Sequence, residues 1–228
     1  MEQAPIFILD YQISEPTNAL TDFIVSATAF YAWWKIRSWV HHSAYLRLMS
    51  YYFLLMGIST FMGGIFAHAI LHWYGHLQKV PGWLVGMVSM FFLEQASIYR
   101  AEEVKVLDRA EAMRWFSRGK LAILLLITIA TQHLNWVGIQ SVTALFLFVL
   151  PLHWRAYRQT SAAVDRYALL AIACSLPIFV VSAFKLSLHH YFNFNDISHI
   201  VMVGCILLFY RACRALLSQF SVEGHILQ

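Results

Sequence analysis

The chain has 228 residues, of which 60% are hydrophobic and only 12% are charged, and its mean hydropathy is +0.60. This composition lies far outside that of soluble domains, so it excludes an ordinary water-soluble protein and indicates an integral membrane protein. We interpret the formal net charge of +4 as a result of membrane topology, and expect no nucleic-acid partner.

Apolar runs of about 20 residues, the length that a helix needs to cross a bilayer, recur along the chain. They predict an all-α protein with a single domain, in which seven helices form a membrane-embedded bundle. The predicted spans lie near residues 20–39, 47–72, 81–99, 119–137, 139–156, 165–188 and 196–217.

The distribution of basic residues predicts the orientation of this bundle. With seven spans and an outer N-terminus, every Lys and Arg except Lys79 and Lys185 lies at an inner end or in an inner loop. The positive-inside rule therefore favours an N-terminus outside and a C-terminus in the cytoplasm. Residues 99–120 carry mixed charges at helical spacing on the inner side, which predicts a solvated interfacial helix. Either a bacterial inner membrane or a eukaryotic endomembrane fits these features.

Ionisable residues occur at membrane depth near the outer end of three predicted spans. The second span carries His68 and His72, which share one helix face at positions i and i+4. The seventh opens with Asp196 and His199 at i and i+3, and Asp22 lies near the outer end of the first. Such groups are costly in hydrocarbon unless they are paired, hydrated or functional. We therefore expect these side chains to converge in one outer layer of the bundle.

Imidazole and carboxylate groups are the ligands that zinc takes where thiolates are absent, and three protein ligands with one open position are typical of catalytic zinc. The expected metal ligands are His68, His72 and His199. Asp196 and Asp22 are the expected proton acceptors, or further ligands.

A simpler interpretation of each residue stays open beside this one. His72 stands next to Trp73 and Tyr74, so it also fits an aromatic belt at the membrane interface. Glu94 lies deep in the third span, where we expect it to pair with Gln95 or with a neighbouring helix and assign it no metal.

Two short motifs resemble the CREST superfamily of membrane hydrolases, which includes the alkaline ceramidases and the progestin and adiponectin receptor family. GIFAH at 64–68 is similar to its S-x-x-x-H motif in the second helix, and NDISHIVMVG at 195–204 to its H-x-x-x-H motif in the seventh. Glu15 is similar to an acidic residue that opens the first helix of the ceramidases. The chain departs from the pattern at Gly64, where the family has Ser, and at Asn195, where it has a further His. Residues 77–83 also lack the usual Asp of the third helix.

The resemblance implies a seven-helix bundle that holds zinc through three His, aided by a Ser and an Asp, and hydrolyses amide or related bonds in lipids. Its ligands here would include His68 and His199. The leading hypothesis is therefore a zinc-dependent hydrolase that acts on a lipid amide or ester. The alternative is a non-catalytic binding or accessory protein whose polar cluster is a structural hydrogen-bond network. A b-type haem protein, with His ligands on facing helices, is a third possibility.

Overall fold

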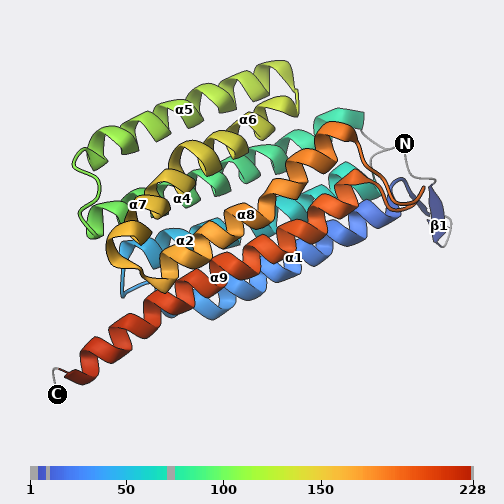
Figure 1. The fold of residues 1–228 in the computed structure, drawn as a ribbon. Helices are drawn as coiled ribbons and strands as arrows, with labels where there is room; N and C mark the ends of the chain where they lie inside the picture. Colours follow the sequence, from blue (N-terminus) through green and yellow to red (C-terminus); the bar gives the residue numbers. More distant parts are fainter. Residues whose placement is uncertain (1–4, 9–10, 71–74, 227–228) are drawn as a thin grey trace.

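A bundle of long helices with a small β-hairpin at one end makes up the computed structural model, which describes residues 5–8, 11–70 and 75–226 (Figure 1). The hairpin pairs β1 (Ile6–Ile8) antiparallel with β2 (Tyr11–Ile13). We call this end of the bundle the hairpin end. The opposite end, beyond which the C-terminal part of α9 projects, is called the basic end (Figure 1).

The helical segments account for every predicted span. In chain order they are α1 (Pro16–Ile36), α2 (Ala44–Met62), the π-helical η1 (Gly63–Ala69), the short 3-10 helix η2 (Gly75–Lys79), α4 (Val80–Glu103), α5 (Ala110–Thr131), α6 (Asn135–Thr143), the π-helical η3 (Ala144–Val149), α7 (Leu150–Thr160), α8 (Ala163–Phe184) and α9 (Phe194–Ile226). α2 continues directly into η1, and α6, η3 and α7 also follow one another without a break. The structure is mostly helical, as the sequence predicts.

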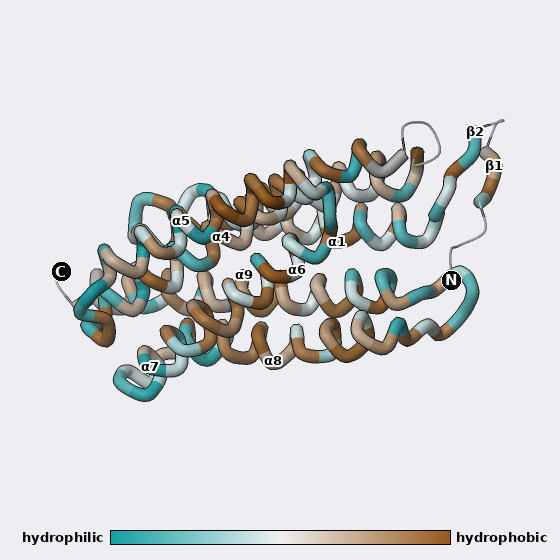
Figure 2. The backbone as a smooth tube through the Cα atoms, turned by 90° about the horizontal axis from the view of Figure 1, so that it is seen from above, coloured by the Kyte–Doolittle hydropathy of each residue, from teal (hydrophilic) through white to brown (hydrophobic). Residues whose placement is uncertain are grey.

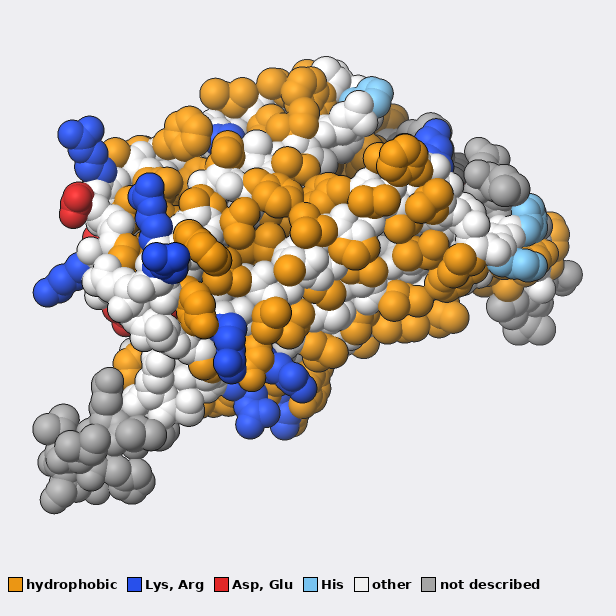
Figure 3. Space-filling model, viewed as in Figure 1, with side chains coloured by type: hydrophobic (Ala, Val, Ile, Leu, Met, Phe, Trp, Pro, Cys, Tyr) orange, Lys and Arg blue, Asp and Glu red, His pale blue; other side chains and the backbone are white. Residues whose placement is uncertain are grey.

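We call each continuous helix a rod, whether it consists of one helical segment or of several joined end to end. Four of the described rods are long and apolar enough to cross a membrane: Ala44–Ala69, Asn135–Thr160, Ala163–Phe184 and Phe194–Phe220. Apolar side chains cover the visible middle of the bundle, whereas Lys and Arg gather towards the basic end (Figure 3). The backbone seen from above is likewise rich in hydrophobic residues along its middle (Figure 2). These are the properties of an integral membrane protein.

The remaining rods, α1, α4 and α5, are less apolar for a structural reason. α1 buries Asn18 and Asp22, and α4 buries Glu94 and Arg100, all facing other helices. The charged residues of α5 lie in its first half. Polar side chains that face the interior of a bundle lower the mean hydropathy of a helix without exposing charge to lipid.

The predicted interfacial helix at 99–120 is wrong. α4 continues to Glu103, residues 104–109 are not helical, and α5 begins at Ala110. Two of its charges are buried between helices: Arg100 Nη2 lies 2.9 Å from Asp165 Oδ2, and Arg114 Nη1 lies 2.6 Å from Glu102 Oε2. Most of the other charged side chains of the segment are exposed, so its surface is solvated although it is not one helix.

α1 packs against α2, η1 and α9, and its approach to η1 is unusually close. A Cβ atom at Gly64 would lie 2.8 Å from the Phe23 ring and 3.2 Å from the Ala19 carbonyl oxygen. A Cβ atom at Gly63 would lie 2.7 Å from Asp22 Oδ2. Small residues at this position therefore let two helices approach more closely than side chains would allow.

We predict that Gly64→Ala lowers stability by about 1–3 kcal/mol, because the added methyl group overpacks the α1–η1 contact. Gly119→Ala is the matched control, since no atom lies within 4 Å of a Cβ there and Ala favours a helix. Thermal unfolding of the detergent-solubilised protein, followed by circular dichroism, measures both. A Gly64→Ala midpoint equal to or above that of the unsubstituted protein would contradict the packing argument.

Candidate functional site

Side chains from α1, η1 and α9 meet at the hairpin end of the bundle. The imidazole rings of His68 and His199 lie with their centroids 6.3 Å apart and their planes at 71°. The Asp22 carboxylate faces both rings: its Oδ2 lies 3.6 Å from His68 Nε2, and its Oδ1 lies 3.3 Å from His199 Nε2. The structure thus brings three of the five residues that the sequence singled out face to face, and a fourth, Asp196, joins them through Thr21.

The backbone around His68 is held in a π-helical turn. The Ile70 amide donates to the Ile65 carbonyl at 2.9 Å, five residues back. The carbonyls of His68 and Ala69 accept hydrogen bonds from the amides of Glu15 and Ser14, at 3.0 and 3.1 Å. The segment between the hairpin and α1 is therefore fastened to the turn that carries His68. Single π-helical turns are frequent at functional sites.

Glu15 orients the His68 ring through a hydrogen bond to Nδ1. Its carboxylate also accepts from Asn18 Nδ2 at 3.2 Å. Burial raises the pKa of Glu15, but the hydrogen bond and charge of His68, the Asn18 hydrogen bond and the charge of Lys79 outweigh it, so this pKa lies below its ordinary value. An ionised Glu15 accepts a hydrogen bond from the Nδ1–H group of His68, and His68 Nε2 then faces Asp22.

Thr21 performs the corresponding task for His199. Its hydroxyl oxygen lies 2.8 Å from His199 Nδ1 and 3.1 Å from Asp196 Oδ1. Asp196 Oδ2 in turn accepts from the Asn193 amide at 2.8 Å, while Asn193 Oδ1 accepts from the Asn195 amide at 2.9 Å. This reciprocal arrangement is a capping box at the start of α9. Asp196 therefore helps to begin the helix and also belongs to the hydrogen-bond network of the site.

The cluster has more negative than fixed positive charge. Within the described ranges, neither Glu15 nor Asp22 forms an ion pair with a Lys or Arg. The negative charge of Asp196 also repels that of Asp22. Carboxylates in an apolar environment are costly unless a positive charge accompanies them. Its carboxylates can therefore be neutralised by protons, on the carboxylates themselves or on the histidines, or by a bound cation.

Two arrangements of the hydrogen atoms show the difference between a cluster balanced by protons and one balanced by a cation. In the first, His68 carries a positive charge between Glu15 and Asp22, and His199 donates from Nε2 to Asp22. In the second, both rings are neutral with the proton on Nδ1, and both Nε2 lone pairs face the Asp22 carboxylate. The second arrangement repels unless a cation lies among these atoms.

The donor set fits zinc in chemistry and in part in geometry. Neighbouring ligands of a tetrahedral zinc with bonds of about 2.0 Å lie about 3.3 Å apart, close to the separations of Asp22 from the two Nε2 atoms. Ring nitrogens held from behind by a carboxylate or hydroxyl are typical of histidines that bind metals. Among the described side chains, however, no group of three or more His, Cys, Asp or Glu already has the spacing of a complete metal centre. The expected third imidazole, His72, lies outside the described residues.

Sequence reasoning missed Thr21 as the link between His199 and Asp196. Its position in α1 just before Asp22 gave no signal, because hydroxyls bond back to their own helix in most membrane spans. The Asn193 to Asp196 spacing is the one signal that was present, since a capping box has a polar residue followed three positions later by an acid or amide.

A second polar cluster surrounds Glu94, deep in α4. The carboxylate bonds to Lys120, to Ser117 Oγ at 2.5 Å and to Gln140 Nε2 at 3.1 Å. These partners come from α5 and α6, and Lys120 Nζ also donates to Thr143 Oγ1 at 2.9 Å. Glu94 thus pairs with neighbouring helices, which is one of the two outcomes expected from the sequence.

A third cluster joins α4, α7 and α8 nearer the basic end. Asp165 accepts from Arg100 Nη2 at 2.9 Å and lies 2.8 Å from His153 Nδ1. None of these three residues stood out in the sequence, because each lies close to a predicted inner end, where charged residues are ordinary.

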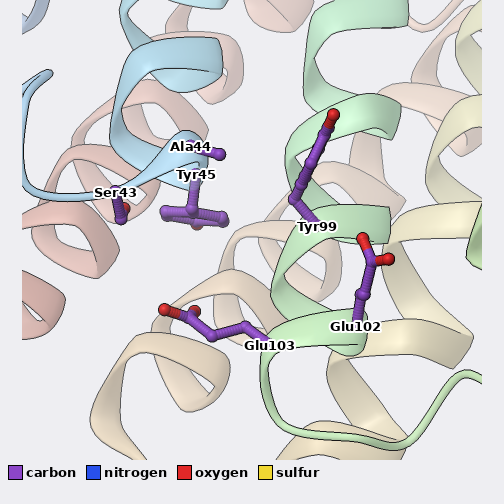
Figure 4. Close-up of a pocket in the computed structure, with 6 residues that line it drawn as sticks. All are labelled: Ser43, Ala44, Tyr45, Tyr99, Glu102 and Glu103. Carbon is purple, nitrogen blue, oxygen red and sulfur yellow. The ribbon is translucent and has the colours of Figure 1, made fainter.

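A shallow pocket of about 220 Å³ also lies at the basic end, between the start of α2 and the end of α4 (Figure 4). Its lining residues are Ser43, Ala44, Tyr45, Tyr99, Glu102 and Glu103. Both carboxylates already pair with arginines, Glu102 with Arg114 and Glu103 with Arg100. The pocket lies at the far end of α2 from His68 and is not part of the histidine cluster.

The fold and the cluster define a mostly helical membrane protein with a polar site between its helices. Residues 17–218 match the model of a family described as "Family of unknown function (DUF6962)", and the chain belongs to this family. No curated protein and no solved structure matches the chain. The matched region includes Thr21, Asp22, His68, Asp196 and His199.

We predict that Thr21→Val destabilises the protein by about 1–3 kcal/mol, because His199 and Asp196 lose the hydroxyl that joins them. Thr28→Val on the same helix is the control: the Thr28 hydroxyl bonds to the Ile24 carbonyl of its own helix, and its loss should cost about 0.5 kcal/mol or less. Thermal unfolding in detergent compares the two. Equal effects would show that the Thr21 bridge contributes nothing beyond a threonine that bonds only to its own helix.

Proposed function

We propose that this protein is a zinc-dependent hydrolase that acts on an amide or ester bond of a membrane lipid. The observation that carries the proposal is the convergence of His68 Nε2 and His199 Nε2 on one carboxylate, that of Asp22, from three separate elements. The unmet need for positive charge at this point supports a cation there. The resemblance of the second-helix and seventh-helix motifs to the CREST hydrolases points in the same direction.

The roles of the residues follow from their contacts. His68, His199 and Asp22 would hold the ion, with His72 as the proposed further ligand. A bound zinc ion supplies Lewis acidity, which polarises a carbonyl and makes a water molecule more acidic. Glu15 and Thr21 hold the two imidazoles in orientation from behind. Asp196, within electrostatic range of Asp22, is the proposed proton acceptor.

The position of the site supports a lipid substrate. The side chains of both histidines keep 14% of their surface exposed, so the cluster is accessible from outside the bundle. It lies near the end of rods whose exposed surface is apolar, where the headgroup and the first acyl carbons of a lipid would be found. We propose that all seven rods span the membrane, with the hairpin end outside and the C-terminus in the cytoplasm, by the distribution of basic residues.

The second candidate function is a non-catalytic membrane protein in which the cluster is a structural network. Every ring nitrogen of His68 and His199 has a protein oxygen within 3.6 Å, so a network of protons can balance the cluster without a metal. A Cβ atom at Gly64 would meet the Phe23 ring, so α1 occupies the space that the Ser of the CREST second-helix motif would need. The haem hypothesis gains no support here, because the Asp22 carboxylate occupies the position between the two imidazoles.

Metal analysis of the purified protein tests the proposal most directly. We expect about one zinc per chain, and loss of that zinc in both His68→Ala and His199→Ala. His133→Ala is the matched control, since His133 is exposed on the turn before α6. Metal-free protein that keeps its thermal stability would contradict the zinc site and favour the structural network.

For the chemistry, we predict that Asp196→Asn retains zinc but lowers kcat for a lipid amide or ester by about 10²–10⁴-fold, the usual contribution of a general base. Hydrolysis is measured with matched amide and ester lipids in mixed micelles. The thermal midpoint of the variant is recorded as well, because Asp196 also caps α9. A stable, zinc-loaded variant with unchanged kcat would remove Asp196 from the mechanism.

A further inference from the structure

Aromatic side chains join α1 to α9 at the basic end. The ring of Tyr210 meets the edge of Tyr31 at a centroid distance of 5.9 Å and stacks on Trp39 at 6.4 Å, with 16° between the planes. Since Tyr31 and Trp39 lie on either side of the end of α1, the three rings close the space between the two helices.

Cations surround these rings. Lys35 Nζ lies 5.6 Å from the centre of the Tyr31 ring, and the charge of Arg214 acts on Tyr210. Arg211 is exposed and shares a helix face with Arg214 at i and i+3. In the space-filling view, Lys and Arg side chains gather where α1 and α9 run side by side (Figure 3).

These cations also lack an acidic partner, unlike the largely buried cations of α4 and α5. Arg100, Arg114 and Lys120 each form an ion pair with a carboxylate of α4, α5 or α8. In the part of the chain that the structure describes, no Asp or Glu lies within ion-pair distance of Lys35, Arg211 or Arg214. The α1–α9 surface therefore presents unneutralised positive charge beside aromatic rings.

The position of this surface along the bundle axis corresponds to the depth of a lipid headgroup. Lys35 follows Asp22 by 13 residues, which corresponds to about 20 Å along the helix. It is the last basic residue of α1, which ends at Ile36. Tyrosine and tryptophan are enriched at this depth, where the ring is apolar and the hydroxyl or ring N–H contacts polar groups.

We propose that the Lys35, Arg211 and Arg214 side chains, with the Tyr31 and Tyr210 hydroxyls, bind the phosphate of an anionic phospholipid at the surface where α1 packs against α9. Phosphate oxygens accept charge-assisted hydrogen bonds from ammonium and guanidinium groups. Basic sites between helices near a membrane surface are suited to acidic headgroups. The proposal depends on this surface alone and not on the zinc hypothesis.

An intact lipid fits better than free phosphate because apolar side chains continue the surface. Leu207 is 40% exposed and lies one turn before Arg211 on the same face of α9. Tyr31, 47% exposed, offers its ring from α1. Acyl chains would pack on these side chains while the phosphate contacts the cations.

Native mass spectrometry of the detergent-solubilised full chain tests the proposal, with phosphatidylglycerol and phosphatidylcholine of identical acyl chains as probes. We expect phosphatidylglycerol to bind one to one and phosphatidylcholine at least tenfold more weakly. In Lys35→Gln/Arg211→Gln, phosphatidylglycerol affinity should fall about 30-fold, which corresponds to ~2 kcal/mol.

The matched control is Arg118→Gln/Arg158→Gln, which removes the same charge from exposed arginines of α5 and α7. It should weaken binding by no more than about threefold, as expected for distant, screened charges. Equal losses in the two double variants would overturn the proposal in favour of general attraction. Equal binding of phosphatidylcholine, or displacement of the lipid by inorganic phosphate at the same concentration, would also overturn it. Unchanged thermal midpoints in both double variants show that the differences do not come from unfolding.

Discussion

The close approach of α1 to the π-helical turn η1 determines the geometry of the hairpin end. Two glycines, Gly63 and Gly64, leave room for Asp22 and Phe23 of α1 where any other residue would place a side chain. The consequence is that one oxygen of the Asp22 carboxylate faces His68 while the other faces His199 of α9, against which α1 also packs. One steric condition thus brings three ionisable groups from distant parts of the chain into one site.

The three polar clusters follow a common physical rule. In an apolar environment, an ionisable group must meet a partner within the protein, so each buried charge joins helices that would otherwise contact only through apolar packing. Glu94 joins α4 to α5 and α6, and Asp165 joins α8 to α4 and α7. Both of these clusters contain a Lys or Arg. The histidine cluster differs because, among the described residues, none of its carboxylates forms an ion pair with a Lys or Arg, and this difference distinguishes a candidate functional site from structural ion pairs.

The same contacts can complete the histidine cluster with protons or with a metal, and the two cases assign different functions to one geometry. With protons, Glu15, Thr21 and the capping box of α9 form a network that fixes α1, η1 and α9 together. With zinc, those groups become the outer support of a catalytic centre. The outer support is present in either case, because it arises from hydrogen bonds that the helix ends need anyway.

Length, hydropathy and the positions of ionisable residues determined much of this protein from the sequence alone: its mostly helical class, the approximate limits of every rod except α5, and the gathering of ionisable groups at one end. These properties are sums over local stretches of chain, so they need no knowledge of neighbouring helices. The hairpin and the early start of α5 at Ala110 were not predicted. Only the tertiary structure decided which partner each polar side chain takes, as with Thr21 between His199 and Asp196, or Lys120 beside Glu94. It also showed that two charges of the 99–120 segment, Arg100 and Arg114, are buried in ion pairs with Asp165 and Glu102. Such pairings depend on the rotation and closeness of helices far apart in the chain, which no local pattern records.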